Sequence, residues 1–214
     1  MVQAIQASEL TLREVKTKFG LEETQDTSLF TEWQENLPQL IDVQKQRLDE
    51  IKANFLYLSE YPMSEEVVKL VMISALLAMA GFYSPPFCIR TENPIKISLE
   101  ENDEEVRGRI DIIVLQEKLW VLVIESKEAG FSLKETIPQA LTYMMATPTP
   151  ELPAFSLVTN GSEFRFIKIL VQPAPKYAFS DLLTLQRREN DLYGVAGILQ
   201  KLADLMRNII PQKS

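Results

Sequence analysis

Asp111, Glu125 and Lys127 lie in a largely apolar stretch, residues 108–127, which reads GRIDIIVLQEKLWVLVIESK. Asp111 belongs to one expected strand, and Glu125 and Lys127 belong to the next. A tight turn centred near Lys118 would place Asp111 directly opposite Glu125, and the two-residue period of a strand puts Glu125 and Lys127 on one face. We therefore expect the three charged groups to meet at one point.

Two opposed carboxylates repel each other, and the penalty grows where water is excluded. Lys127 offsets part of this repulsion. Mg²⁺ would offset more, because this ion binds one or two carboxylates together with substrate phosphate. The residue types and their spacing therefore favour a metal site that hydrolyses phosphodiesters. The alternative interpretation is an ordinary ion pair of Lys127 with Glu125 or Asp111 at the end of a strand.

The elements that must position these residues follow from hydrophobic periodicity and turn signals. Alternating, β-branched segments predict strands, and a three- to four-residue period predicts helices. The expected strands cover residues 87–91, 94–99, 106–115, 119–126, 154–159, 163–171 and 178–185, and the acidic residues 100–105 form a turn. The expected helices cover residues 64–80, 136–146 and 191–210.

Residues 1–62 are expected to form a helical N-terminal extension, and residues 63–214 the main domain. A short helix is expected near residues 8–19. In a second helix, apolar residues recur at three- and four-residue steps and form a stripe: Ile41, Leu48, Ile51, Phe55 and Leu58. The stripe either packs on the chain's own core or forms the seam of a homodimer, and periodicity alone leaves both open.

The composition excludes several kinds of site. The chain has no histidine, which removes Ser-His-Asp hydrolases, histidine-based nucleases and Cys₂His₂ zinc fingers. The single cysteine, Cys88, excludes an intrachain disulfide and suits a reducing cytosol. No secretory signal is visible, and the longest apolar run is too short to span a bilayer. We therefore expect a cytoplasmic protein that has no membrane partner.

The charge balance bears on the substrate. A net charge of −8 is unusual for a protein that binds nucleic acid, since basic patches normally neutralise the phosphates. A small basic footprint and a divalent ion would still hold one phosphate. The sparse candidates for such a footprint are Lys96, Arg107, Arg109, Lys134 and Arg165.

Several motifs follow one another in a defined order. They are Gly108-Arg109-Ile110-Asp111, then Glu125-Ser126-Lys127 as an ExK motif, then Gln139-Ala140-Leu141-Thr142-Tyr143 as a QxxxY motif. Together with an upstream helix over residues 64–81 and the segment 157–161, they resemble the PD-(D/E)xK nuclease superfamily. The nearest resemblance is to the nuclease domain at the N-terminus of type I restriction enzyme R subunits, and it covers about residues 63–170. Position 110 is isoleucine where many members have proline.

The resemblance implies a fold and a metal site. The implied fold is a restriction-endonuclease-like core of three layers, α/β/α, with a mixed central sheet. Asp111, Glu125 and the carbonyl of Ser126 would bind Mg²⁺, for which Mn²⁺ can substitute. Lys127 would orient or activate the attacking water and stabilise the developing charge.

Two further elements of the family pattern supply candidate residues. A glutamate of the first helix often completes the metal site. We expect Glu66, because Leu70, Ile73 and Leu77 lie on its helical face and lead into the core, while Glu65 lies closer to the face of Met72. Gln139 and Tyr143 are four residues apart and so share a helical face. In the family, that face looks toward the site and can position the substrate or the lysine.

The function that follows is Mg²⁺-dependent hydrolysis of phosphodiester bonds in DNA. The alternative is a catalytically silent module that keeps the nuclease fold and binds nucleic acid or a protein partner. The expected partners are DNA and, beyond it, a homodimer or a larger restriction or repair assembly.

Overall fold

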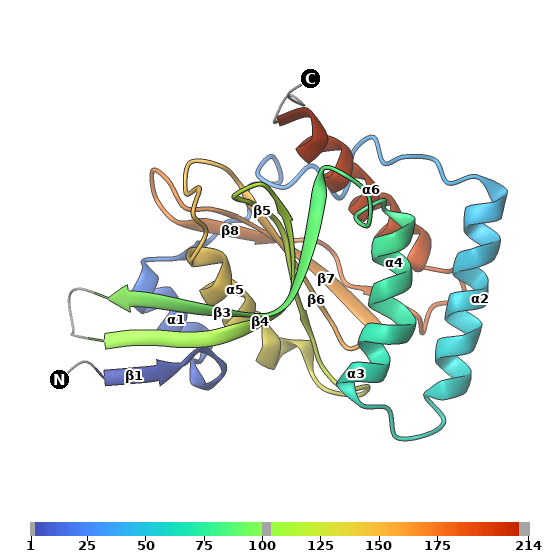
Figure 1. The fold of residues 1–214 in the computed structure, drawn as a ribbon, viewed down its shortest axis with the longest axis horizontal. Coiled ribbons are helices and arrows are strands. Elements are labelled where there is room, and N and C mark those ends of the chain that lie inside the picture. The colour runs from blue at the N-terminus through green and yellow to red at the C-terminus, as the bar shows by residue number, and fades with distance from the viewer. Residues whose placement is uncertain (1–2, 100–103, 210–214) are drawn as a thin grey trace.

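One mixed β-sheet runs through the molecule, and helices cover both of its faces (Figure 1). The computed structural model describes residues 3–99 and 104–209. The main path through the sheet has the strand order β1-β4-β5-β6-β7-β8-β2, while β3 pairs with β4 and β9 with β7. The strands are β1 Gln3–Gln6, β2 Glu22–Glu23, β3 Phe87–Leu99, β4 Glu104–Gln116, β5 Leu119–Ser126, β6 Ala154–Thr159, β7 Glu163–Leu170, β8 Lys176–Phe179 and β9 Leu183–Thr184.

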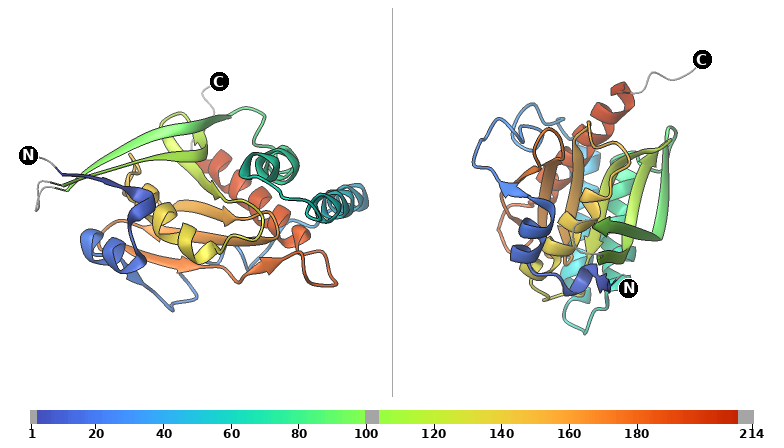
Figure 2. Two further views of the ribbon diagram at one scale, coloured as in Figure 1. Left: turned by 90° about the horizontal axis from the view of Figure 1, so that it is seen from below. Right: turned by 90° about the vertical axis from the view of Figure 1, so that its left-hand side faces the viewer.

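A hydrophobic core lies on each face of the sheet, between the sheet and the helices that pack on it. One core joins the sheet to α2, α3, α4 and α6, and the other joins the opposite face to α1 and α5 (Figure 2). The helices are η1 Ala7–Glu9, α1 Leu12–Phe19, α2 Asp42–Leu58, α3 Glu65–Val68, the π-helical turn η2 Lys69–Ile73, α4 Ser74–Met79, α5 Leu133–Met145 and α6 Leu192–Ile209. The expected three-layer α/β/α fold is confirmed. None of the helices in the described segments combines the length and apolar character that crossing a bilayer requires.

The N-terminal segment is more than a helical extension. The helix expected near residues 8–19 is present as α1, but β1 pairs in parallel with β4 and β2 pairs in parallel with β8. The described part of this segment, residues 3–62, therefore adds a strand at each end of the main path through the sheet, as well as the helices α1 and α2.

The apolar stripe of α2 packs on the chain's own core. Leu48, Ile51 and Phe55 are buried against the same core as α6, whereas Ile41 at the start of the stripe is 64% exposed. Of the two alternatives, the structure favours intrachain packing, because the buried centre of the stripe is not accessible to a second copy.

The β3–β4 arm differs in detail from the expected strands. The segments 87–91 and 94–99 form one strand, β3, which passes through Glu92 at a positive φ of 51°. Proline at position 94 is tolerated because β3 pairs only with β4 and so lies at an edge. Glu104 and Glu105, expected in a turn, already belong to β4, and residues 100–103 of that expected turn lie outside the described residues.

The strand expected over residues 178–185 is divided. β8 ends at Phe179 and β9 begins at Leu183, and the two strands pair with different parts of β7. The side chain of Ser180 causes the break locally, because its hydroxyl accepts a hydrogen bond from the Phe166 N–H at 3.0 Å in place of a ladder bond.

Candidate active site

The register between β4 and β5 brings Asp111 and Glu125 together. Ile112 pairs with Ile124, and the continuation of this register places Asp111 opposite Glu125. The Asp111 N–H donates a hydrogen bond to Glu125 Oε1 at 3.2 Å. The predicted pairing of the two acids is therefore present.

A β-bulge produces this register. The two strands are joined by the two-residue turn Glu117–Lys118, which pairs Leu115 with Trp120. Without a further change, that turn would place Asp111 opposite Ile124 rather than Glu125. Between Val114 and Leu115 the pairing shifts by one residue, which leaves Val121 as the extra residue of β5. A one-residue shift moves every following side chain to the other face, so the bulge decides which residue meets Asp111.

Glu125 is a buried carboxyl group with an unsatisfied oxygen. Its exposed fraction is 0%, and its Oε2 atom has no hydrogen-bond partner among the described residues. Burial raises the pKa of Glu125 well above its ordinary value, the negative charge of Asp111 raises it further, and the charge of Lys127 partly opposes both. A cation beside the free oxygen would stabilise the ionised carboxylate and so oppose the effects of burial and of Asp111.

Asp111 is held by the strand across from it. Its Oδ2 atom accepts hydrogen bonds from the Ser126 N–H at 2.8 Å and from the Ser126 hydroxyl at 3.2 Å. The Asp111 side chain is 12% exposed, so this carboxylate lies nearer the surface than the fully buried Glu125. Ser126 therefore lies at the cluster, as predicted.

Glu65, and not Glu66, is the helical glutamate that reaches the cluster. Glu65 Oε1 accepts a hydrogen bond from the Ser126 hydroxyl at 3.4 Å, and Glu65 Oε2 lies 4.0 Å from Lys127 Nζ. Glu66 is exposed, and the pKa of its carboxyl group is lowered chiefly by a hydrogen bond from the Ser64 side chain. The structure thus places Glu65 at the cluster instead of the expected Glu66.

Apolar spacing did not decide between the two glutamates. Leu70, one of the three residues that pointed to Glu66, is 73% exposed, but the other two, Ile73 and Leu77, are buried. Met72, which pointed to Glu65, is buried as well. The wider π-helical turn η2 follows α3 directly and changes the spacing of buried positions along the helix. The contacts of Glu65 with Ser126 and Lys127 are what place its side chain at the cluster.

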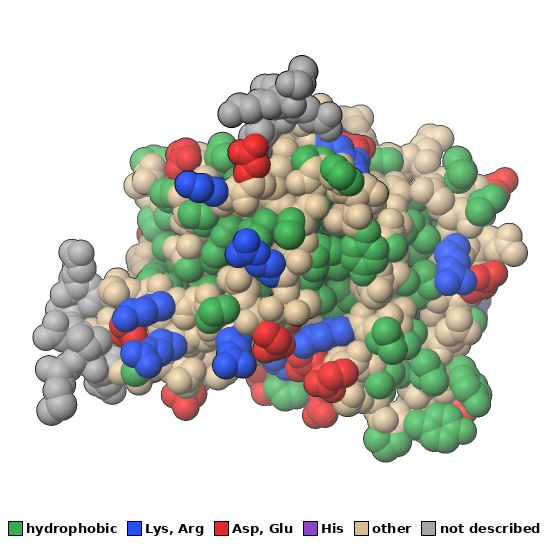
Figure 3. All heavy atoms as spheres, viewed as in Figure 1, with side chains coloured by type: hydrophobic (Ala, Val, Ile, Leu, Met, Phe, Trp, Pro, Cys, Tyr) green, Lys and Arg blue, Asp and Glu red, His purple; other side chains and the backbone are tan. Residues whose placement is uncertain are grey.

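Two lysines supply the positive charge of the cluster. Lys127 follows β5, and its N–H donates to the Thr159 carbonyl at 3.0 Å, which anchors its backbone at the end of β6. Lys69, which the sequence did not single out, contacts both Glu65 and Asp111. The i,i+4 spacing of Glu65 and Lys69 is the signal that could have indicated it. Beside the N-terminal end of α3, acidic and basic side chains gather next to an apolar surface (Figure 3).

Gln139 and Tyr143 lie on α5 and approach the backbone just before Asp111. Gln139 Nε2 donates to the Tyr143 hydroxyl at 2.9 Å, and this hydroxyl also accepts from the Arg109 N–H at 3.2 Å. Burial, followed by the nearby charge of Glu125, raises the pKa of Tyr143 to about 12. The Tyr143 hydroxyl therefore stays protonated at physiological pH. Together with Gln139 it holds the strand that carries Asp111.

The donor set fits a divalent cation, although it is not assembled around one. Carboxylates and a carbonyl are the ligands that Mg²⁺ prefers, and the orphaned Glu125 Oε2 offers a free acceptor inside the cluster. Within residues 3–99 and 104–209, no three Asp, Glu, His or Cys side chains converge as a complete metal-binding group. The carboxylates instead share their charge with the two lysines.

Comparison with known families agrees with this geometry. The family described as type I restriction enzyme R protein N terminus matches residues 11–173, which is well over half of the chain. The chain belongs to this family. None of the curated proteins is similar enough to count as a match. The resemblance to the N-terminal domain of type I restriction enzyme R subunits is thereby confirmed, and the matched region includes α1, α2 and the strands β2 to β7.

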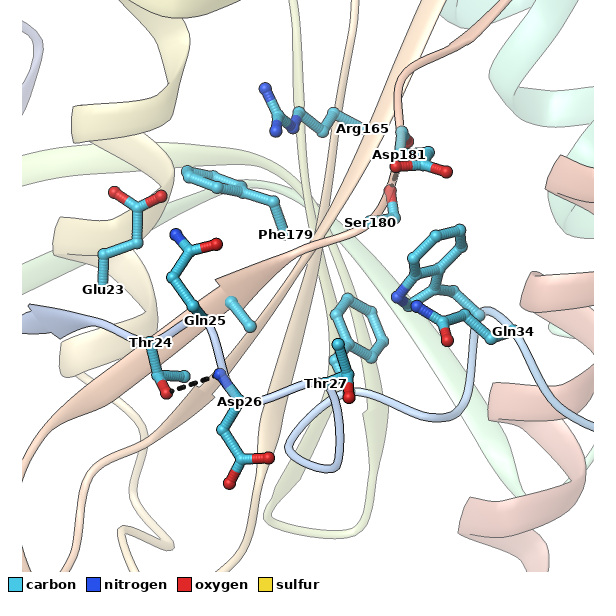
Figure 4. A pocket seen from close by; sticks show the side chains of 13 residues that line it. Glu23, Thr24, Gln25, Asp26, Thr27, Gln34, Arg165, Phe179, Ser180 and Asp181 are labelled. Atoms are coloured by element: carbon cyan, nitrogen blue, oxygen red, sulfur yellow. Dashed lines mark hydrogen bonds between the residues drawn. The ribbon is translucent and has the colours of Figure 1, made fainter.

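The other cations predicted to meet phosphate are mostly engaged elsewhere. Lys96 and Arg107 both pair with Glu105 on the β3–β4 arm. Arg165 stacks over the Phe179 ring at 4.3 Å and lines a separate hollow of about 400 Å³ that shares no residue with the acidic cluster (Figure 4). Since Glu23, Asp26 and Asp181 line the same hollow, its charge does not favour a phosphate.

Gly108 allows Tyr143 to reach this strand, and a substitution there is expected to be costly. A Cβ atom at position 108 would lie 2.5 Å from the Tyr143 hydroxyl, far inside van der Waals contact. We expect Gly108→Ala to lower the free energy of unfolding by about 1–3 kcal/mol through overpacking. Thermal denaturation measures this loss.

Gly197→Ala on α6 is the matched control for Gly108→Ala. A Cβ atom at position 197 would meet Leu37 at an ordinary 3.7 Å, so the control should be neutral or slightly stabilising. Equal melting temperatures for Gly108→Ala and the wild type would contradict the close approach of Tyr143.

Proposed function

We propose that this protein is a metal-dependent deoxyribonuclease that hydrolyses phosphodiester bonds in DNA. The observation that carries the proposal is that Asp111 and the buried Glu125 lie side by side, near the ammonium group of Lys127, and that Glu125 Oε2 has no hydrogen-bond partner among the described residues. Membership of the R-protein N-terminal family supports it. Two opposed carboxylates at a strand end have no evident packing role, and perturbed ionisation of this kind is common at active sites.

The carboxylates of Asp111 and Glu125 would hold Mg²⁺, with the carbonyl oxygen of Ser126 as a further ligand, and Mn²⁺ would substitute. When bound, such an ion supplies Lewis acidity toward a phosphoryl oxygen and activates water. Glu65 lies at the same cluster and is the candidate for a further acidic ligand, in place of Glu66.

The remaining steps belong to the chain's own residues. Lys127 directs its ammonium group into the cluster from a backbone fixed on β6, so it can donate to an oxygen on which negative charge develops. Gln139 and Tyr143 act indirectly. The Tyr143 hydroxyl, held by Gln139, accepts from the Arg109 N–H and so fixes the strand that carries Asp111. They are therefore positioning residues.

Incubation of supercoiled plasmid with the purified chain tests the proposal. We expect nicking with Mg²⁺ or Mn²⁺ and none with excess chelator. Lys127→Ala should lower the rate by at least about 100-fold, the usual cost of removing one charge-stabilising donor. Lys45→Ala is the matched control, because Lys45 is an exposed lysine on α2, away from the cluster, and its rate should equal that of the wild type.

A panel of single-stranded, double-stranded and branched DNA would then define the substrate. Absence of divalent-ion binding at millimolar concentration, together with absence of nicking, would contradict the nuclease proposal. DNA binding that persists without cleavage would favour the silent binding module, for which the net charge of −8 and the lysine-filled cluster are the supporting observations.

A further inference from the structure

Lys69 is the cation most closely associated with the acidic cluster. Its Nζ atom lies 2.5 Å from Glu65 Oε1, 3.4 Å from Asp111 Oδ1 and 3.8 Å from Glu92 Oε1. No step of the proposed hydrolysis uses this lysine. Its contacts therefore need a separate explanation.

The helix delivers this ammonium group by its local geometry. Lys69 is the first residue of the π-helical turn η2 and follows Glu65 by four residues, so both side chains leave the same face. The Lys69 side chain is only 21% exposed. Burial lowers the pKa of Lys69, but the hydrogen bond to Glu65 and the charge of Asp111 outweigh burial and raise it above its ordinary value. Lys69 is therefore charged where it contacts the carboxylates.

Lys69 contacts carboxylate oxygens that a metal ion would also need. Lys69 binds Asp111 Oδ1, while the other oxygen, Oδ2, is taken by the two Ser126 donors. Both Asp111 oxygens and one Glu65 oxygen are thus engaged without a metal ion. A divalent ion and the Lys69 ammonium group repel each other at this short range, so Lys69 weakens the binding of the ion to the same oxygens.

We propose that Lys69 is a built-in counter-ion of the metal-free site and competes with the divalent ion for Asp111 and Glu65. The inference rests on the proposed function and concerns regulation of the same site. Lys69 also lines an open hollow of about 340 Å³ with Leu70 and Tyr83, which gives its side chain space to withdraw. The metal site then forms only when the ammonium group moves aside.

Calorimetric titration with Ca²⁺ in the absence of DNA tests the competition without relying on cleavage. Lys69→Met and Lys69→Gln remove the charge and keep a side chain of similar length. Both should bind Ca²⁺ at least about tenfold more tightly than the wild type, since one adjacent positive charge is removed. Lys45→Met, at an exposed lysine of α2 that makes no ion pair with the described residues, should stay within about twofold of the wild type.

Thermal denaturation of the metal-free proteins gives an independent readout and checks that the variants fold. Both Lys69 variants should melt below the wild type, because Glu65 and Asp111 lose their counter-ion, and excess Ca²⁺ should restore more stability to them than to the wild type. Binding by the variants but not by the wild type would also support the competition.

Other outcomes count against it. Equal or weaker Ca²⁺ binding by both Lys69 variants would overturn the inference, and it would leave the nuclease proposal intact if the wild type still binds the ion and nicks DNA. Failure of every chain to bind a divalent ion would overturn the inference and the nuclease proposal together.

Discussion

Glu125→Gln is expected to stop metal-dependent cleavage and, at the same time, to stabilise the metal-free protein. The substitution removes a proposed metal ligand, and we expect the rate to fall by at least about 100-fold. It also removes a buried carboxyl group that is repelled by Asp111 and has an unpartnered oxygen. Relief of such a group should contribute about 1–3 kcal/mol to the free energy of unfolding.

The stabilisation should depend on pH in a defined direction. The pKa of Glu125 in the folded protein lies well above the ordinary value of 4.5, so the folded state binds the proton more tightly than the unfolded state. Wild-type stability is therefore lost as pH rises from the unfolded pKa through the raised folded pKa. Glutamine does not titrate, so the gain in the variant should be small near pH ~4 and largest at neutral and alkaline pH.

Differential scanning calorimetry in excess chelator measures this gain, with Glu128→Gln as the control. Glu128 has the same carboxyl group as Glu125 and lies three residues after it, but its side chain is exposed. Its substitution should therefore leave both the melting temperature and its pH dependence unchanged. For a chain of this size, about 1–3 kcal/mol corresponds to a rise of several degrees. A Glu125→Gln variant that melts below the wild type at neutral pH would show that the ionised carboxylate is structurally required.

Ile51→Asp is expected to unfold the protein rather than to separate two copies of it. Ile51 is 4% exposed and lies in the core beneath α2. An aspartate there loses the apolar contacts and buries an unpaired charge, which should cost at least about 4 kcal/mol. That is a large share of the 5–15 kcal/mol that typically separates folded and unfolded states.

Val43→Asp is the matched control on the same helix. Val43 is 72% exposed, so its substitution should leave the melting temperature nearly unchanged. Circular dichroism reports folding, and light scattering reports mass. Retention of the fold by Ile51→Asp with a halved mass would contradict intrachain packing and restore the homodimer seam.

The residues of the cluster were largely predictable because strand periodicity is a local property. The bounds 119–126 and 154–159 predicted for two strands are those of β5 and β6. Alternation within a strand depends on neighbours in the chain, so the strands that carry Asp111 and Glu125 could be inferred before any packing was known, whereas Ser126 was named only through the family resemblance. The roles of these residues in catalysis stay predictions.

The pairing of Asp111 with Glu125 was predicted from a turn centred near Lys118, but the structure reaches it by a different route. The turn is shorter than that placement implies, and the bulge at Val121 restores the register. Such a bulge depends on how both faces of β5 pack against the two cores, and turn chemistry does not reveal it.

The sequence by itself determined the strands that carry the acids, because strand alternation is a short-range signal, and its motifs implied the layered α/β/α class through the family resemblance. Only the tertiary structure decided that Glu65 replaces Glu66, that Lys69 joins the acids, and that α2 is buried against its own chain. These outcomes depend on the rotation of a helix against a sheet. That rotation is set by the summed packing of residues distant in sequence and by one π-helical turn, and neither leaves a local periodic signal.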